Sequence, residues 1–228
     1  MLQAVIFDLD GTLANTIPAI REGVNLTMAK YGYPQHTDAD ILKFINNGAR
    51  ELIRRAMPEA LRTNEEQVSR VLANYDVLYG GVYHHTDRLY DGVEDTLRKI
   101  RDELGLSIAV LSNKQDQFVR RLCDQLLPHG LCQHAQGVIA GKPSKPNPYL
   151  AGLVSQALNI PLCDCVMVGD SDVDIRTAQE AGMAHIGVAW GYRSKEFLLQ
   201  NGATLIADTP LALYKALASM TKRSDQNK

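Results

Sequence analysis

The spacing of apolar residues changes sharply near the beginning of the sequence. Residues Ala4–Phe7 are apolar at every position, which is typical of a short strand buried on both faces. From Ile17 to Tyr31, apolar side chains instead recur every three or four positions, which is the spacing of an amphipathic helix. Gly32 and Pro34 follow this stretch and favour its end. The pattern therefore predicts a buried strand followed by a long helix.

The next segment has helical spacing throughout. Three further helices are predicted at residues 37–44, 49–57 and 65–83, and no convincing strand pattern occurs between residues 15 and 88. We interpret the Met and Tyr residues of this segment as a small core of its own rather than as a cofactor site. The sequence thus predicts two units. Residues 15–88 form an all-helical insert, and residues 1–14 join residues 89–228 in a second unit.

Beyond residue 90, strand and helix patterns alternate. Strands are predicted at residues 106–111, 138–140, 165–168, 185–188 and 204–206, with helices after Gly92, near Phe118, at 150–158 and 175–182, and near Phe197 and Leu213. Such alternation indicates a parallel sheet covered on both faces. The predicted fold class is α/β, with a Rossmann-like doubly wound parallel sheet core and an inserted all-helical unit. Because right-handed crossovers place the carboxyl ends of all strands at one edge, we expect the residues after the strands to converge.

Composition and charge limit the possible partners. The 228 residues are 45% hydrophobic with a formal charge of −2, which suits a globular core and gives no basic footprint for nucleic acid. No apolar run approaches the roughly 20 residues of a membrane span, and no signal peptide is visible. The four cysteines lack zinc-site spacing and are interpreted as reduced thiols. We therefore predict a cytoplasmic protein without nucleic-acid or membrane partners, either monomeric or dimeric.

Two carboxylates follow the first predicted strand. Asp8 and Asp10 lie one residue apart, and Gly11 and Thr12 turn the chain away from the strand. Because carboxylates this close repel each other, they require a shared proton or a hard cation such as Mg²⁺. The alternative is a polar turn in which aspartate only serves the turn geometry. The strand before the pair and the Gly-Thr after it favour a functional site.

Polar residues also follow three of the later strands. Ser112 and Asn113 can donate hydrogen bonds to phosphate oxygens, although such a pair is common in ordinary turns. Lys145 lies in a proline-rich loop, where it is either a positioned charge for a phosphate or a solvated side chain. Asp170 follows the next strand, and Asp174 lies one helical turn further on. The alternative for this acidic pair is a helix N-terminus favoured by the helix dipole.

These segments together resemble the four motifs of the haloacid dehalogenase superfamily of phosphotransferases. They occur in the order of that family, as Asp8-Leu9-Asp10-Gly11-Thr12, Ser112, Lys145-Pro146-Asn147-Pro148, and Gly169-Asp170-Ser171 with Asp174. The helical insert lies between the first two motifs, as in members with a type 1 helical cap. Residues 45–50 and 190–193 are similar to segments of phosphoglycolate phosphatases. Asn15, Thr16 and Asp91 depart from the usual pattern.

The resemblance implies a reaction and a role for each motif residue. It implies a Mg²⁺-dependent phosphomonoester hydrolase that acts on a small phosphorylated metabolite, similar to phosphoglycolate, through an aspartyl-phosphate intermediate. Asp8 is then the nucleophile and Asp10 the general acid and base. The implied metal ligands are Asp8, the backbone carbonyl of Asp10, and Asp170, with Asp174 supporting them. The implied substrate- and phosphate-binding residues are Ser112, Asn113, Lys145 and Arg50.

Three other functions remain open from the sequence. A sugar-phosphate mutase of the same superfamily would retain all four motifs and differ in the cap. A haloacid dehalogenase would not need the second aspartate of the first motif. A non-enzymatic binding module on this fold would be expected to have lost at least one motif carboxylate, and this sequence retains them all.

Three residue assignments also remain open. Lys142 precedes a proline, as Lys145 does, and competes with it for the third motif, although the distance to the next helix favours Lys145. Arg50 is equally compatible with an ordinary surface position. His84, His85 and Asp87 contain metal-binding groups, but adjacent side chains on a helix point apart, which favours a solvated helix end.

Overall fold

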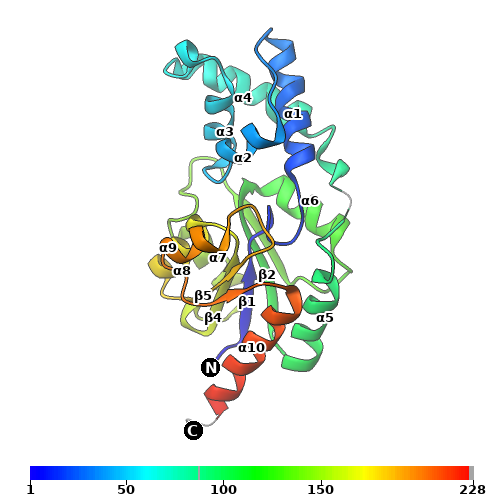
Figure 1. The fold of residues 1–228 in the computed structure, drawn as a ribbon, viewed down its shortest axis with the longest axis vertical. Coiled ribbons are helices and arrows are strands. Elements are labelled where there is room, and N and C mark those ends of the chain that lie inside the picture. The colour runs from blue at the N-terminus through cyan, green and yellow to red at the C-terminus, as the bar shows by residue number, and fades with distance from the viewer. Residues whose placement is uncertain (87, 226–228) are drawn as a thin grey trace.

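The computed structural model describes residues 1–86 and 88–225, and its centre is a six-stranded parallel sheet. The strand order is β3-β2-β1-β4-β5-β6, which is the doubly wound order expected of a Rossmann-like core. The strands are β1 (Ala4–Phe7), β2 (Ser107–Gln115), β3 (His134–Val138), β4 (Cys165–Gly169), β5 (Ala184–Val188) and β6 (Ile206–Ala207). The predicted α/β fold class is therefore confirmed (Figure 1).

Helices cover both faces of the sheet because successive strand residues point to opposite sides. Val5 and Phe7 pack against α5 (Val93–Leu104), α6 (Asp116–Leu126) and α10 (Pro210–Asp225). Ala4 and Ile6 pack against α7 (Tyr149–Leu158) and α8 (Asp172–Ala181). The short helix α9 (Lys195–Gln200) contacts β5. All four of these β1 residues are buried, which explains why the first strand is apolar throughout.

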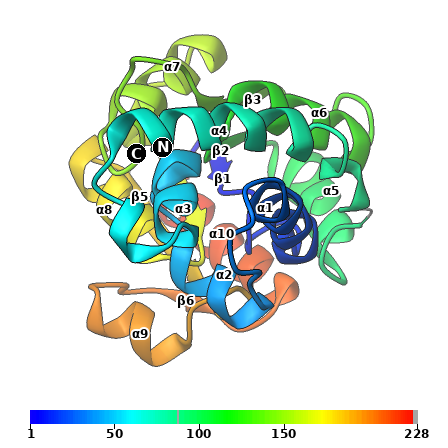
Figure 2. The same ribbon diagram turned by 90° about the horizontal axis from the view of Figure 1, so that it is seen from above.

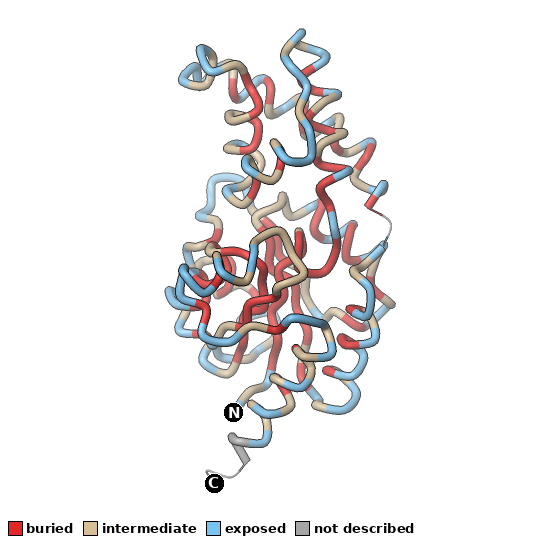
Figure 3. Tube along the Cα trace, viewed as in Figure 1, coloured by how far each residue is buried: buried red, intermediate tan, exposed pale blue. Residues whose placement is uncertain are grey.

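A second layer of helices lies above the carboxyl edge of the sheet (Figures 1 and 2). It consists of α1 (Ile17–Lys30), α2 (Asp38–Phe44), α3 (Gly48–Ala56) and α4 (Glu65–Tyr79), with 3₁₀ turns at Glu59–Leu61 and Tyr83–His85. These helices bury a separate apolar cluster, visible as the upper buried segments in Figure 3. Phe118 of α6 joins that cluster from the sheet side. The division at residues 15 and 88 stays a prediction.

Several predicted boundaries differ from the structure, and three of them differ most. The strand predicted at 106–111 continues to Gln115, with a shift of register after Leu111. The helix predicted at 65–83 ends at Tyr79, where Gly80 and Gly81 follow. The strand predicted at 138–140 instead spans His134–Val138. This strand contains polar residues, and its position depends on pairing with β2, which apolar spacing alone does not reveal.

Glycines allow the strand ends to approach one another at the carboxyl edge. A Cβ atom on Gly169 would lie 2.3 Å from Cγ of Asp174, and one on Gly191 would lie 2.3 Å from Cβ of Asp170. Gly11 has a positive φ of 90° in the turn after β1, a conformation that side chains disfavour. The carboxylates of this edge therefore pack directly against bare backbone.

We expect Gly169→Ala to destabilise the protein by about 1–3 kcal/mol, the usual cost of overpacking. The added methyl group would overlap the buried side chain of Asp174. Gly152→Ala in α7 is the matched control, because its Cβ would meet nothing within 4 Å. That change should stabilise the protein by about 0.5–1 kcal/mol, since alanine favours a helix interior over glycine. Urea unfolding measures both, and equal effects would contradict the steric argument.

Candidate active site

The candidate site lies where the chain order of the sheet reverses, between β1 and β4. Asp8 directly follows β1, and its backbone N–H donates to the carbonyl of Val168 in β4 at 2.8 Å. Asp170 directly follows β4. Both side chains are buried, at 7% and 2% exposure for the whole residue. The sheet thus brings together two carboxylates that are far apart in the sequence.

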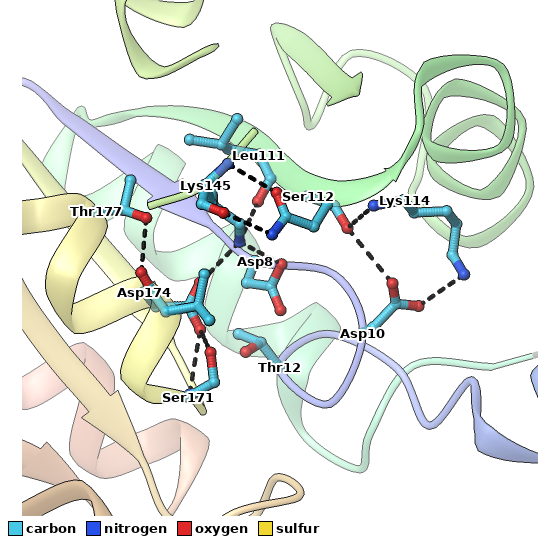
Figure 4. Close-up of polar contacts among 12 residues, drawn as sticks. Asp8, Asp10, Thr12, Leu111, Ser112, Lys114, Lys145, Ser171, Asp174 and Thr177 are labelled. Atoms are coloured by element: carbon cyan, nitrogen blue, oxygen red, sulfur yellow. Dashed lines mark hydrogen bonds and ion pairs between the residues drawn. The ribbon is translucent and has the colours of Figure 1, made fainter. Parts of the chain in front are cut away.

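The ammonium group of Lys145 lies between two of the carboxylates (Figure 4). Its Nζ is 2.7 Å from Oδ1 of Asp8 and 2.7 Å from Oδ1 of Asp174, and it also donates to the carbonyl of Leu111 at 2.9 Å. Burial alone would lower the pKa of Lys145, but Asp174 and Asp8 outweigh it and raise that pKa. Lys145 therefore remains charged, and the competing Lys142 instead lies 5.8 Å from the ring centre of Tyr149.

Asp174 is held by the first turn of α8. Ser171 donates to Oδ2 of Asp174 from both its backbone N–H at 3.1 Å and its hydroxyl at 2.6 Å. This arrangement is a capping box that satisfies the start of the helix. The other carboxylate oxygen of Asp174 accepts from Lys145. Asp174 therefore fixes the lysine and the helix start at once.

Asp170 is held by two donors from separate segments. The hydroxyl of Thr12 donates to Oδ1 at 3.1 Å, and the backbone N–H of Tyr192 donates to Oδ2 at 2.7 Å. Burial and the nearby Asp174 raise the pKa of Asp170 to about 7, against the smaller opposing effects of these donors. Burial also raises the pKa of Asp8, although Lys145 opposes this. The negative charge of these buried carboxylates is therefore only partly balanced unless a further positive charge lies beside them.

The residues present fit a divalent metal ion. Asp8, Asp170 and Asp174 each offer a carboxylate oxygen within 4.8 Å of the others, and within the described residues they are the one such group found. Three carboxylates and a single ammonium leave an excess of negative charge, and oxygen ligands suit Mg²⁺. The side chain of Asp10 lies outside this group. The group of Asp10 that was predicted to bind the metal is its backbone carbonyl, and this assignment stays a proposal.

The alternative cluster of histidines is not assembled in the described residues. Nδ1 of His85 lies 2.7 Å from Oε2 of Glu22, an exposed pair at the edge of the helical layer. The rings of His84 and His85 pack edge to face, with centroids 4.5 Å apart. Asp87, the third member considered, lies outside the described residues.

Asp10 lines the cavity and has three side-chain neighbours, of which Ser112 and Lys114 are labelled in Figure 4. Thr16 donates from its hydroxyl to Oδ1 at 2.6 Å, and Nζ of Lys114 lies 3.1 Å from the same oxygen. The hydroxyl of Ser112 is 3.4 Å from Oδ2. Thr16 also contacts the hydroxyl of Tyr192, which accepts from the Thr16 backbone N–H at 2.9 Å.

Sequence reasoning assigned no role to three of these residues. Lys114 follows the second motif directly, and Tyr192 lies in the late loop whose similarity was noted. Thr16 stands at a position that departs from the usual pattern. The position of these residues in or beside a motif was the only sign in the sequence that they belong to the site. It did not indicate which atoms would be in contact.

The structure gives Asn113 a different set of contacts from the predicted one. Its Oδ1 accepts from the backbone N–H of Lys145 at 2.8 Å, and its Nδ2 donates to the carbonyls of Lys145 at 3.0 Å and Asn46 at 3.1 Å. The amide is therefore occupied by backbone groups of two loops. It holds Lys145 in place and ties the loop before α3 to the sheet. Ser112, by contrast, is buried at the cavity wall as predicted for a phosphate neighbour, although phosphate binding itself stays a proposal.

The structure does not bring Arg50 to the site. Its guanidinium donates to Oε2 of Glu65 and to the hydroxyl of Ser69, both at 2.9 Å, and the side chain is 46% exposed. Among the described residues that line the cavity, Arg50 is absent. The first turn of α3 turns this side chain toward α4 instead. The predicted contact of Arg50 with a substrate stays a prediction.

A cavity separates the sheet edge from the helical layer. It encloses about 660 Å³, part of which is open to solvent, and this lies in the range of pockets for small molecules. Its floor contains Asp8, Asp10 and Lys145. Its upper wall is mainly apolar and aromatic, formed by Ile20, Ile45, Ala49, Leu52, Tyr75 and Tyr79. The arrangement can enclose a small anionic molecule with one end at the carboxylates.

Fold and site together define an α/β enzyme with a buried carboxylate cluster beneath a helical cover. A family model described as haloacid dehalogenase-like hydrolase matches residues 5–188. The chain therefore belongs to the haloacid dehalogenase-like hydrolases, and the family predicted from the four motifs is confirmed.

Within this family, the chain is similar to several phosphoglycolate phosphatases. The phosphoglycolate phosphatase of Vibrio parahaemolyticus serotype O3:K6 is 27% identical, over 95% of this chain and 96% of its own length. That of Aliivibrio fischeri is 31% identical, over 91% of this chain and 92% of its own. A crystal structure from Lactobacillus delbrueckii subsp. bulgaricus, of a protein provisionally named phosphoglycolate phosphatase, matches with a TM-score of 0.86 and 31% identity. It covers 94% of this chain and 97% of that protein. The predicted similarity to this group of phosphatases is confirmed.

Two further observations bear on the predicted surroundings of the protein. Across residues 1–86 and 88–225, no helix is long and apolar enough to cross a membrane. Cys123, Cys132, Cys163 and Cys165 are all free thiols. The second observation agrees with the interpretation of these residues as reduced cysteines.

We expect the metal-free protein to lose stability as the pH rises from about 4 to about 7. In this range folded Asp170, with its pKa of about 7, holds a proton that the unfolded chain, with an ordinary value of 3.8, has released. Each unit of such a pKa difference corresponds to about 1.4 kcal/mol. Urea unfolding in a chelator should show a weaker pH dependence for Asp170→Asn than for the unmodified protein. Identical slopes would contradict the shifted pKa.

Proposed function

We propose that the protein is a Mg²⁺-dependent phosphomonoester hydrolase that acts on a small phosphorylated metabolite, similar to phosphoglycolate, through an aspartyl-phosphate intermediate. The observation that carries this proposal is the position of Lys145 between Asp8 and Asp174, at the floor of a cavity of small-molecule size. A fixed ammonium beside a buried carboxylate suits the approach of a phosphate group to that carboxylate. The named activity of its relatives supports the same class of substrate.

The first half of the reaction transfers the phosphoryl group to the protein. The carboxylate of Asp8 attacks phosphorus, a bond forms from its oxygen, and the bond from phosphorus to the ester oxygen breaks. Asp10 gives a proton to that leaving oxygen, so that an alcohol departs. Lys145 offsets the negative charge on the transferred group, and the hydroxyl of Ser112 lies at the wall beside it.

The second half releases phosphate. A water molecule attacks phosphorus of the aspartyl-phosphate, Asp10 accepts a proton from that water, and the bond to the oxygen of Asp8 breaks. Inorganic phosphate leaves and both carboxylates return to their initial states. Asp8, Asp170 and the backbone carbonyl of Asp10 would hold Mg²⁺, with Asp174 supporting the set. The bound metal would supply positive charge that allows an anionic nucleophile to approach an anionic phosphate.

The helical unit at residues 15–88 acts as a cap in this proposal. It covers the cavity, keeps bulk water from the phosphorylated aspartate, and selects the leaving group. A sugar-phosphate mutase of the same superfamily is the second candidate, because it would use the same four motifs. A cytoplasmic location accords with the free thiols, and the substrate is the partner that this function requires.

Asp8→Asn is expected to abolish turnover while the fold survives, because asparagine lacks the attacking carboxylate. Phosphate release from a panel of small phosphomonoesters measures this, with circular dichroism to check folding.

Activity of the unmodified protein should disappear in excess chelator and return with Mg²⁺. More than trace turnover by Asp8→Asn would refute the covalent mechanism, and full activity in chelator would refute the metal requirement.

Lys145→Ala should reduce kcat by about 10²-fold or more, the scale for losing one preorganised contact to the transition state. Lys142→Ala is the control from the same loop, since its amine lies over the ring of Tyr149 and is exposed. It should change kcat little. Steady-state kinetics with one phosphomonoester would compare the two variants, and the reverse order of effects would assign the motif to Lys142.

A further inference from the structure

A lysine lies on the cavity wall opposite the carboxylate cluster. Lys114 lines the cavity at the end of β2, and its side chain is 8% exposed. Among the described residues that line the cavity, the other lysine is Lys145, which is already bonded to Asp8 and Asp174. Lys114 is therefore the lysine that faces the part of the cavity where a leaving group would lie.

The helical cover holds the ammonium group of Lys114 from above. Its Nζ donates to the hydroxyl of Tyr79 at 3.1 Å and lies 4.9 Å from the centre of that ring. Both contacts come from α4, whereas the ion pair with Asp10 at 3.1 Å comes from the turn after β1. Burial alone would lower the pKa of Lys114, but Asp10 together with Tyr79 and Tyr75 raises it. A charged lysine is thus fixed between the general acid and the cap.

A second donor on the same wall has no partner. Nδ2 of Asn46 is buried and has no hydrogen-bond partner among the residues that the structure describes. Asn46 lines the cavity, as do Gly48 and Ala49 at the first turn of α3. A buried donor without an acceptor is unfavourable, and an oxygen atom of a ligand would satisfy it. The start of a nine-residue helix beside it also favours a negative charge.

We propose that Lys114 and Asn46 determine substrate specificity by binding the carboxylate on the leaving group of a substrate similar to phosphoglycolate. This inference rests on the proposed function, since it places the ester oxygen at Asp10. Because Lys114 contacts Asp10 directly, an anion bound to Lys114 lies only a few bonds from the ester oxygen.

The test compares a carboxylate ester with its neutral analogue. Binding of 2-phosphoglycolate and of its amide, phosphoglycolamide, is measured by calorimetry with Mg²⁺ in an Asp8→Asn background, which prevents turnover. Lys114→Met in that background should weaken binding of 2-phosphoglycolate about 10- to 100-fold, the scale for a hydrogen bond to a charged group. Binding of the amide should change less than about threefold. Equal losses for both ligands would overturn the subsite, because Lys114 would then act only through Asp10.

A second variant leaves Asp10 and its ion pair untouched. Asn46→Gly removes the unpartnered amide and retains a residue that tolerates the positive φ of 84° at this position. This variant should weaken the binding of 2-phosphoglycolate about three- to tenfold, as expected for the loss of one hydrogen bond, and should leave the binding of phosphoglycolamide unchanged. No change for either ligand would remove Asn46 from the subsite and contradict the proposal.

Two controls separate this subsite from other basic residues and from the proposed function. Lys99→Met removes a lysine that lies 5.9 Å from the ring centre of Tyr214, outside the cavity. This variant should bind both ligands as the protein with Lys99 does. A selective loss of 2-phosphoglycolate binding in Arg50→Met, and not in Lys114→Met, would overturn the assignment. Hydrolysis of p-nitrophenyl phosphate by the unmodified protein tests the proposed function separately, because this neutral leaving group does not use the subsite.

Discussion

Three carboxylates buried around one ammonium are the constraint on which the rest of this structure depends. Charges of one sign cannot be buried together without compensation, and Lys145 compensates only two of the three directly. The members come from three parts of the chain, namely the end of β1, the loop before α7, and the segment from Asp170 to Asp174. The glycines that flank the cluster are required because the carboxylates pack against backbone at distances that exclude a side chain. The doubly wound sheet is the device that brings these parts to one edge.

The helical layer is bonded to the carboxylate cluster at two separate places. Asn113 joins the backbone of Lys145 to the carbonyl of Asn46, at the entrance to α3. Tyr192 joins the start of α1 to the sheet, since its hydroxyl accepts from Thr16 while its backbone N–H donates to Asp170. Movement of the helical layer that separated these pairs would also remove hydrogen-bond partners from the groups that hold Lys145 and Asp170. The position of the helical layer and the order of the carboxylate cluster are therefore linked by hydrogen bonds as well as by packing.

The parts of the fold that depend on local pattern were predictable from the sequence. Buried strands such as β1 and β4 are apolar throughout, and the strand ends then locate Asp8 and Asp170 without knowledge of any distance. The strand β3 was misplaced because its polar residues are specified by pairing with β2. The contacts of Arg50 could not be predicted for a similar reason, because the local pattern does not reveal the ion pair that Arg50 forms with Glu65.

The position of Lys114 bears on the difference between a hydrolase and a mutase. A mutase must hold a phosphorylated sugar so that either end can reach the same aspartate, which requires binding groups at a distance from the acid that serves the ester oxygen. Here the cation on the cover side is 3.1 Å from Asp10, so the charge it offers lies beside the reacting bond. Beyond it the wall combines apolar and aromatic side chains with the amide groups of Asn46, Asn113 and Gln115. A positive charge beside the reacting bond supports the proposed hydrolase, in which a short anionic leaving group would depart after one transfer.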